Sequence, residues 1–115
     1  MTEVTIEKHS SLPNLKIITV KGSIDGITYE YVEEKILPLI EQEAPNIILD
    51  LTQVDYLNSM GVMSIIKFHL LLTDKNRACK IIKPPKFVYS ILHVAGLTHH
   101  FDMYDTMETA MSTLK

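Results

Sequence analysis

The sequence contains only one cysteine, Cys79. A single thiol cannot close a disulfide within the chain, and it cannot supply the paired spacing of a zinc site. A chain without a disulfide framework fits a reducing, intracellular setting, so we expect a cytoplasmic protein. The opening residues Met1-Thr2-Glu3-Val4 lack the basic start and apolar stretch of a signal peptide, and none is expected.

Long apolar runs and clusters of one charge are also missing. The apolar runs are too short to span a bilayer, so no membrane insertion is expected. The net charge is −3 with acidic and basic residues interspersed, and without a basic stripe we expect no direct contact with nucleic acid. We find no linker, repeat or low-complexity segment. With 115 residues, of which 46% are hydrophobic, the sequence predicts one domain over residues 1–115.

Motifs of catalysis and cofactor binding are absent as well. Gly22 and Gly26 lack the spacing and the lysine of a phosphate-binding loop. Ser59 lacks the Gly-x-Ser-x-Gly frame of a nucleophile elbow. His99 and His100 are adjacent, and neighbouring side chains of a strand point to opposite faces, which disfavours a shared metal ion. We expect no enzymatic activity, no cofactor and no metal site.

The secondary-structure signals of the chain alternate between strand and helix. Strand patterns fall at Val4–Glu7, Leu15–Lys21, Asn46–Leu51, Lys80–Ile82 and Phe101–Tyr104. Helical spacing falls at Thr28–Glu43, Met60–Thr73, from Pro84-Pro85 to Ala95 with Gly96 as the C-terminal cap, and from Met107 to Leu114. Pro38 should kink the first helix or end it early, and Asp105 is expected to cap the last helix. The order ββαβαβαβα predicts an α/β fold with a central mixed sheet and about four helices.

The most informative segment runs from Asp50 to Ser59, where a buried strand leads through an expected polar turn into a long apolar helix. A serine at such a junction is a natural N-cap, because its hydroxyl accepts from a free amide of the first turn. The same position tolerates a phosphate, since a helix N-terminus favours negative charge. Met60 follows in the first turn, and we expect it to be exposed, where it suits an apolar partner.

Four segments of the chain together resemble the STAS domain family, whose stand-alone members include bacterial anti-sigma factor antagonists. They are Gly22-Ser-Ile-Asp25, Ile47–Leu51 with Val54–Leu57, Asn58-Ser-Met-Gly-Val62, and Ile82–Leu97 followed by Phe101 and Met107-Glu-Thr-Ala110. The match is colinear and covers nearly the whole chain. Two positions depart from the family signature, because Asn58 replaces an aspartate and Met60 replaces a serine or threonine.

The resemblance implies that Ser59 is a phosphorylation site in a partner-switching pathway. In the family, the unphosphorylated antagonist binds a serine-kinase anti-sigma factor and frees the sigma factor. The kinase phosphorylates the antagonist and so releases it, and a PP2C-type phosphatase restores it. The resemblance also implies a monomer when free and a partner-binding surface made of Gly22, Ser23, Asp25, Asn58, Ser59, Met60, Gly61 and Val62.

Several alternatives stay open from the sequence. Ser59 is a plain helix cap in one of them, and Asp25 is a turn residue that binds only local amides. STAS-like domains also serve as accessory subunits of membrane transport complexes, including lipid transporters, where the same face docks an ATPase subunit. Others bind nucleotides or small molecules, although no phosphate-binding motif supports that here.

Overall fold

The computed structural model describes residues 2–8, 12, 14–96 and 101–114. The strands are β1 (Glu3–Lys8), β2 (Leu15–Ile24), β3 (Asn46–Leu57), β4 (Cys79–Ile82) and β5 (Asp102–Tyr104). The helices are α1 (Tyr29–Glu43), α2 (Ser59–Asp74), α3 (Lys86–Val94) and α4 (Met107–Ser112). The order ββαβαβαβα and the α/β class expected from the sequence are confirmed.

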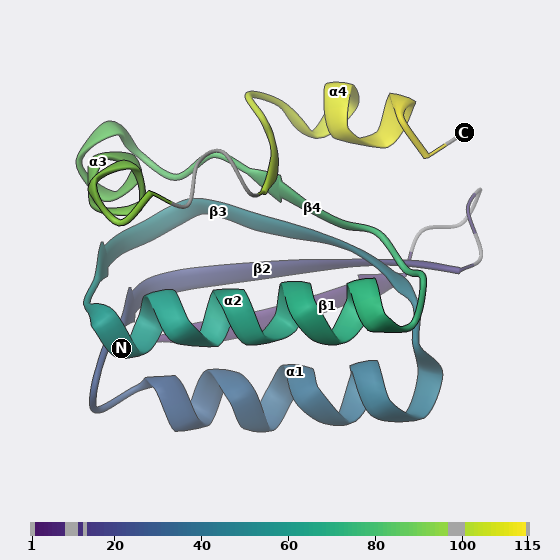
Figure 1. Ribbon diagram of the computed structural model, residues 1–115, viewed down its shortest axis with the longest axis horizontal. Helices are drawn as coiled ribbons and strands as arrows, with labels where there is room; N and C mark the ends of the chain where they lie inside the picture. The colour runs from purple at the N-terminus through teal and green to yellow at the C-terminus, as the bar shows by residue number, and fades with distance from the viewer. Residues whose placement is uncertain (1, 9–11, 13, 97–100, 115) are drawn as a thin grey trace.

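The five strands form one mixed sheet in the order β1-β2-β3-β4-β5. β1 and β2 pair antiparallel as a hairpin, whereas the β2–β3, β3–β4 and β4–β5 pairs are parallel. Since β2, β3 and β4 are parallel, their carboxyl ends lie at one edge of the sheet (Figure 1). The connections from these strands to α1, α2 and α3 therefore gather at that edge, which places the candidate site.

Both faces of the central strands are buried. Alternate residues of β3 point to opposite faces, so that Ile47 and Leu49 enter the larger core while Ile48 enters a smaller one. The larger core takes the apolar stripes of α1 and α2, which are Val32, Ile36 and Ile40 on α1 and Ile65, Phe68 and Leu72 on α2. Val88 and Leu92 of α3 join the same core. α4 covers the opposite face of the sheet (Figure 1), with Ala110 in the smaller core.

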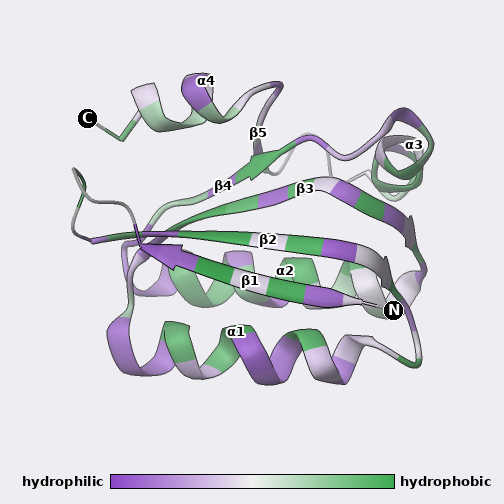
Figure 2. Cartoon of the chain, turned by 180° about the vertical axis from the view of Figure 1, so that it is seen from behind, coloured by the Kyte–Doolittle hydropathy of each residue, from purple (hydrophilic) through white to green (hydrophobic). Residues whose placement is uncertain are grey.

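The hydropathy of the elements matches this layering. Figure 2 shows hydrophobic residues along β2, β3 and α2, and hydrophilic residues interspersed along α1. A helix that is apolar almost all round is buried, whereas one with a single apolar stripe lies at the surface. Both helices bury an apolar stripe in the larger core, and α1 turns its hydrophilic residues to solvent.

Two strands are longer than the sequence predicts. β3 continues from Leu51 to Leu57, and β2 continues from Lys21 to Ile24, because these two segments pair with each other through polar positions. Gly22, Ser23 and Ile24 therefore belong to β2, and the turn before α1 begins at Asp25. Gly22 keeps its place in the strand at a φ of 101°, beside a register shift, which is a backbone conformation that favours glycine.

The ends of α1, α3 and α4 were each predicted from the sequence. α1 runs through Pro38 to Glu43 without ending early, since Pro38 and Glu34 lie on the exposed face, where water can serve the carbonyl oxygen of Glu34. The cap of α4 is Thr106, whose hydroxyl accepts from the amide of Thr109, so the expectation of Asp105 was wrong by one residue. Gly96 follows α3 at a φ of 77° and donates to the carbonyl of His93, as expected of a C-terminal cap.

Candidate functional site

The N-terminus of α2 is capped by Asn58 and not by Ser59. Asn58 has an extended backbone, and its side-chain oxygen accepts from the amides of Met60 at 2.9 Å and Gly61 at 3.2 Å. Its own amide donates to the carbonyl oxygen of Ile24 at 3.3 Å, which fixes the residue at the end of β3. The expectation that Ser59 is the cap was wrong, because Ser59 already belongs to α2, whereas Asn58 has the extended backbone and the accepting side chain of an N-cap.

Ser59 differs chemically from a cap residue, because its hydroxyl does not hold the helix end. Ser59 is the first residue of α2 and is exposed. Within the described part of the chain its hydroxyl has no hydrogen-bond partner. The helix does not need this hydroxyl, so it is available to react or to contact another molecule.

The turn between β2 and α1 is held together by Asp25. Its side-chain oxygen accepts from the amides of Ile27 at 2.9 Å and Thr28 at 3.1 Å. These two backbone hydrogen bonds, that from Ile27 first, hold the pKa of Asp25 below its ordinary value. The Thr28 hydroxyl donates to the carbonyl of Ser23 at 2.8 Å and closes the turn. Asp25 therefore binds local amides as a turn residue does, and whether it also contacts a partner stays a prediction.

The structure brings this turn against the start of α2. Ile24 pairs with Leu57 and accepts from the Asn58 amide. A side-chain carbon added at Gly26 would lie 3.8 Å from the Asn58 side-chain nitrogen. Segments about 30 residues apart in sequence thus form one surface, because the carboxyl ends of parallel neighbouring strands coincide.

The predicted partner-binding residues do not all reach that surface. Gly61 and Val62 are buried, since α2 packs on β2 at this point. Gly22, Ser23 and Met60 are half-buried, so Met60 is less exposed than expected, and Ser59 is exposed. Sequence reasoning missed Ile27 and Met63, which are 90% and 61% exposed. Their apolar character was visible in the sequence, but only the fold shows that they face solvent.

Polar side chains join α1 to α2 next to the surface that contains Ser59. Glu33 accepts from the Ser64 hydroxyl at 2.6 Å and from the Lys67 ammonium at 2.8 Å. Burial raises the pKa of Glu33, and the hydrogen bonds from Lys67 and Ser64 overcome this, so that the pKa lies below its ordinary value. Ser64 is fully buried and engaged, which leaves Ser59 as the accessible serine of α2.

The other candidate groups lie away from this surface or outside the described residues. His99 and His100 fall outside the described residues. The residues that the structure describes contain no cluster of three or more potential metal ligands. Cys79 is buried in β4, and burial raises the pKa of its thiol to about 12, which makes it a poor nucleophile. Over the described part of the chain, no helix has both the length and the apolar character needed to cross a bilayer.

The model of the STAS domain family matches residues 4–110 of this chain. This chain is a member of the STAS domain family. No curated protein shows a significant match to it.

Several solved structures share the fold of this STAS domain. An anti-sigma factor antagonist from Mycobacterium paratuberculosis is 22% identical, with a TM-score of 0.87 over 98% of this chain and 93% of that one. The anti-sigma factor antagonist SpoIIAA in its unphosphorylated form is 21% identical, with a TM-score of 0.80 over 97% of this chain and 96% of that one. A sulfate transporter family protein from Wolinella succinogenes is 16% identical, with a TM-score of 0.74 over 92% of each chain. At these identities the likeness shows the fold alone.

The cap assignment in this STAS domain predicts different effects at two adjacent residues. Asn58→Ala should lower the free energy of unfolding by about 1 kcal/mol, because two amides of α2 lose their acceptor. Ser59→Ala should change it by less than about 0.5 kcal/mol, as an exposed substitution without a broken hydrogen bond. Urea unfolding of both variants checks this. A larger loss for Ser59→Ala than for Asn58→Ala would contradict the assignment.

Proposed function

We propose that this STAS domain is an anti-sigma factor antagonist in a partner-switching pathway and has no catalytic activity of its own. In this proposal the unphosphorylated protein binds an anti-sigma factor serine kinase and frees a sigma factor. Phosphorylation of Ser59 by the kinase releases the protein, and a PP2C-type phosphatase restores it. The likeness to anti-sigma factor antagonists supports this role at the level of the fold.

The observation that carries the proposal is the state of the Ser59 hydroxyl. It is exposed, it lies at the first position of a long helix, and no residue in the described part of the chain binds it. A serine that makes no local hydrogen bond can enter a kinase active site without breaking one, and Asn58 leaves Ser59 in this state by taking the cap. The helix dipole then favours the negative charge that the phosphate adds.

The test is phosphorylation by the anti-sigma serine kinases encoded in the same genome. Each purified kinase is incubated with the protein and ATP, and intact-mass analysis follows the addition of phosphate. We expect one phosphate on the wild type and none on Ser59→Ala. The exposed serines Ser90 and Ser112 remain in both proteins as internal controls. Phosphate on either of these, or on no residue with any kinase, would contradict the proposal.

A second candidate function is that of a subunit or domain that docks in a membrane transport complex. The likeness to a sulfate transporter family protein and the uncharged Asn58 favour it. In that case the protein would bind its partner constitutively. Copurification of a transporter ATPase with both wild type and Ser59→Asp, together with no phosphorylation, would favour this alternative over partner switching.

A further inference from the structure

Ile27 is the most exposed of the large hydrophobic side chains in the described part of the chain, with 90% of its surface open to solvent. Its backbone is nevertheless fixed, because its amide donates to the Asp25 side chain at 2.9 Å. A side chain carried on a fixed backbone loses little entropy when it enters a partner pocket. The exposed Ile27 side chain on its fixed backbone therefore resembles an anchor residue of a protein interface. Because it is not buried, it adds little to the stability of the fold.

Tyr31 extends the apolar surface that begins at Ile27. It lies in the first turn of α1, whereas Ile27 lies in the turn just before the helix. Tyr31 is 38% exposed. The two residues line a groove of about 360 Å³ together with Thr2, Glu3 and Thr28. We call Ile27 and Tyr31 the α1 patch.

The surroundings of the α1 patch are acidic. Residues 25–35 contain four carboxylates, Asp25, Glu30, Glu33 and Glu34, and one lysine, Lys35. Asp25 is used within the turn and Glu33 is paired with Lys67. Glu30 and Glu34 are exposed, and within the described residues neither is in an ion pair.

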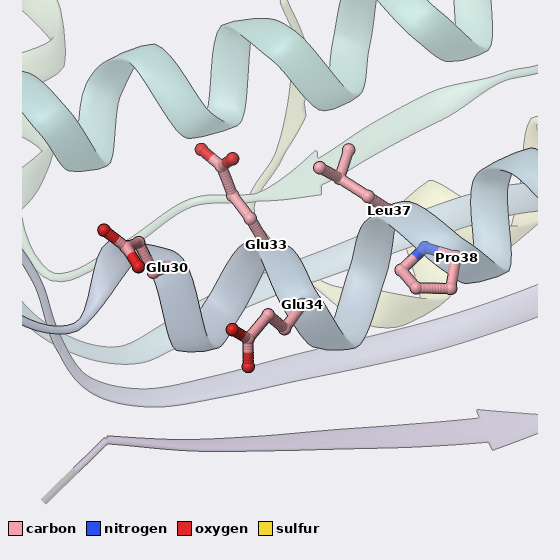
Figure 3. A pocket seen from close by; sticks show the side chains of 5 residues that line it. All are labelled: Glu30, Glu33, Glu34, Leu37 and Pro38. Carbon is pink, nitrogen blue, oxygen red and sulfur yellow. The ribbon is translucent and has the colours of Figure 1, made fainter.

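The acidic residues flank a second hollow on α1. Glu30, Glu33, Glu34, Leu37 and Pro38 line a pocket of about 310 Å³. Glu33 and Leu37 point toward α2, and Glu34 points to the other side of α1 (Figure 3). A partner that covers the α1 patch meets the Lys35 ammonium over the Tyr31 ring, 5.6 Å from the ring centroid. It also meets the unpaired carboxylates of Glu30 and Glu34, which favour lysine or arginine side chains facing them.

We propose that Ile27 and Tyr31 anchor the protein partner of the Ser59 site, and that this partner presents an apolar pocket bordered by lysine or arginine side chains facing Glu30 and Glu34. The inference rests on the proposed function, which supplies the partner. The α1 patch and Ser59 belong to one surface. Gly26, which precedes Ile27, lies against Asn58, which precedes Ser59. The partner's basic side chains face α1 and not the Ser59 hydroxyl. A phosphate on Ser59 therefore still meets a close-fitting, desolvated part of the interface, which disfavours binding.

The first test measures the affinity of the kinase that phosphorylates Ser59 for the unphosphorylated protein by calorimetry. Ile27→Ala should weaken binding by about 30-fold or more, as for an anchor residue. Ile6→Ala is the matched control, because Ile6 is also exposed, at 40%, but lies on the edge strand β1. It should change affinity by less than about twofold. Unchanged thermal midpoints show that both variants remain folded.

The outcomes separate this inference from the proposed function. A kinase that modifies Ser59 of the wild type and binds Ile27→Ala equally well overturns the inference alone. If no kinase binds or modifies the wild type, both are overturned.

The second test addresses the charge of the partner through the rate of association. The double variant Glu30→Gln/Glu34→Gln should associate about tenfold more slowly at low salt, with a weaker salt dependence than the wild type. Glu41→Gln/Glu108→Gln removes the same charge at two other exposed positions and should leave both quantities nearly unchanged. The discrimination between unphosphorylated and phosphorylated Ser59 should be the same in all three proteins. Faster association of the Glu30→Gln/Glu34→Gln variant would overturn the assignment of a basic border.

Discussion

Gly61→Ala is expected to lower the free energy of unfolding by about 3 kcal/mol or more. A Cβ atom at position 61 would lie 2.1 Å from the carbonyl oxygen of Ile24 and 3.0 Å from its Cβ. Neither can move freely, because the same carbonyl accepts from the Asn58 amide and Ile24 is paired with Leu57. The variant must therefore lift the start of α2 from β2, which also disturbs the Asn58 cap.

Urea unfolding followed by circular dichroism measures this loss. Gly26→Ala is the matched control, since a Cβ there would meet only the Asn58 side-chain nitrogen at an ordinary 3.8 Å. That substitution should change the free energy of unfolding by less than about 1 kcal/mol. If Gly61→Ala proved as stable as Gly26→Ala, the close approach of α2 to β2 would be wrong, and with it the geometry that presents Ser59.

The core of the fold could be predicted from the sequence because periodicity reports burial directly. Val32, Ile36 and Ile40 repeat every four residues and do lie in the core. The continuous apolar run at the start of β3 indicated a strand covered on both faces, and Ile47, Ile48 and Leu49 divide between the two cores. Such patterns follow from geometry within one element, which the sequence contains in full.

Element ends were less predictable because they depend on contacts between elements. Asn58 and Ser59 are both good caps by type, as are Asp105 and Thr106. At Asn58 the choice is made by the hydrogen bond of its amide to Ile24, which belongs to another strand. The extension of β3 to Leu57 has the same origin, since its polar residues are held by pairing with β2.

The candidate site was also predictable only in part. The resemblance to STAS domains located Ser59 and the Gly22–Asp25 segment, but it could not say which side chains face outward. Ile27 carries no motif, and Met63 fits a helical apolar stripe as well as any core residue. Both are exposed because of how the start of α1 and α2 are set against the sheet. The surface that a partner meets is thus a property of the packed elements.

Phosphorylation of Ser59 is expected to leave the fold intact and to weaken partner binding by about 100-fold or more, which corresponds to about 2.7 kcal/mol. The phosphate adds about 1.5 to 2 negative charges. At the first position of α2 the helix dipole offsets part of that charge, so the thermal midpoint should move by less than about 5 °C. In an interface fitted to a neutral hydroxyl the same charge must be desolvated without a counter-ion, which costs several kcal/mol.

Three substitutions separate charge from size and from position. Ser59→Asp should reproduce a large part of the loss of affinity, whereas Ser59→Asn has the same bulk without the charge and should bind more tightly than Ser59→Asp. Ser112→Asp adds an equal charge on the exposed side of α4, remote from the site, and should bind as the wild type does. If Ser59→Asn and Ser59→Asp lost equal affinity, the effect would be steric. If phosphorylated and unphosphorylated protein bound the kinase equally, Ser59 would not act as a switch, and constitutive docking would be the better account of its exposed hydroxyl.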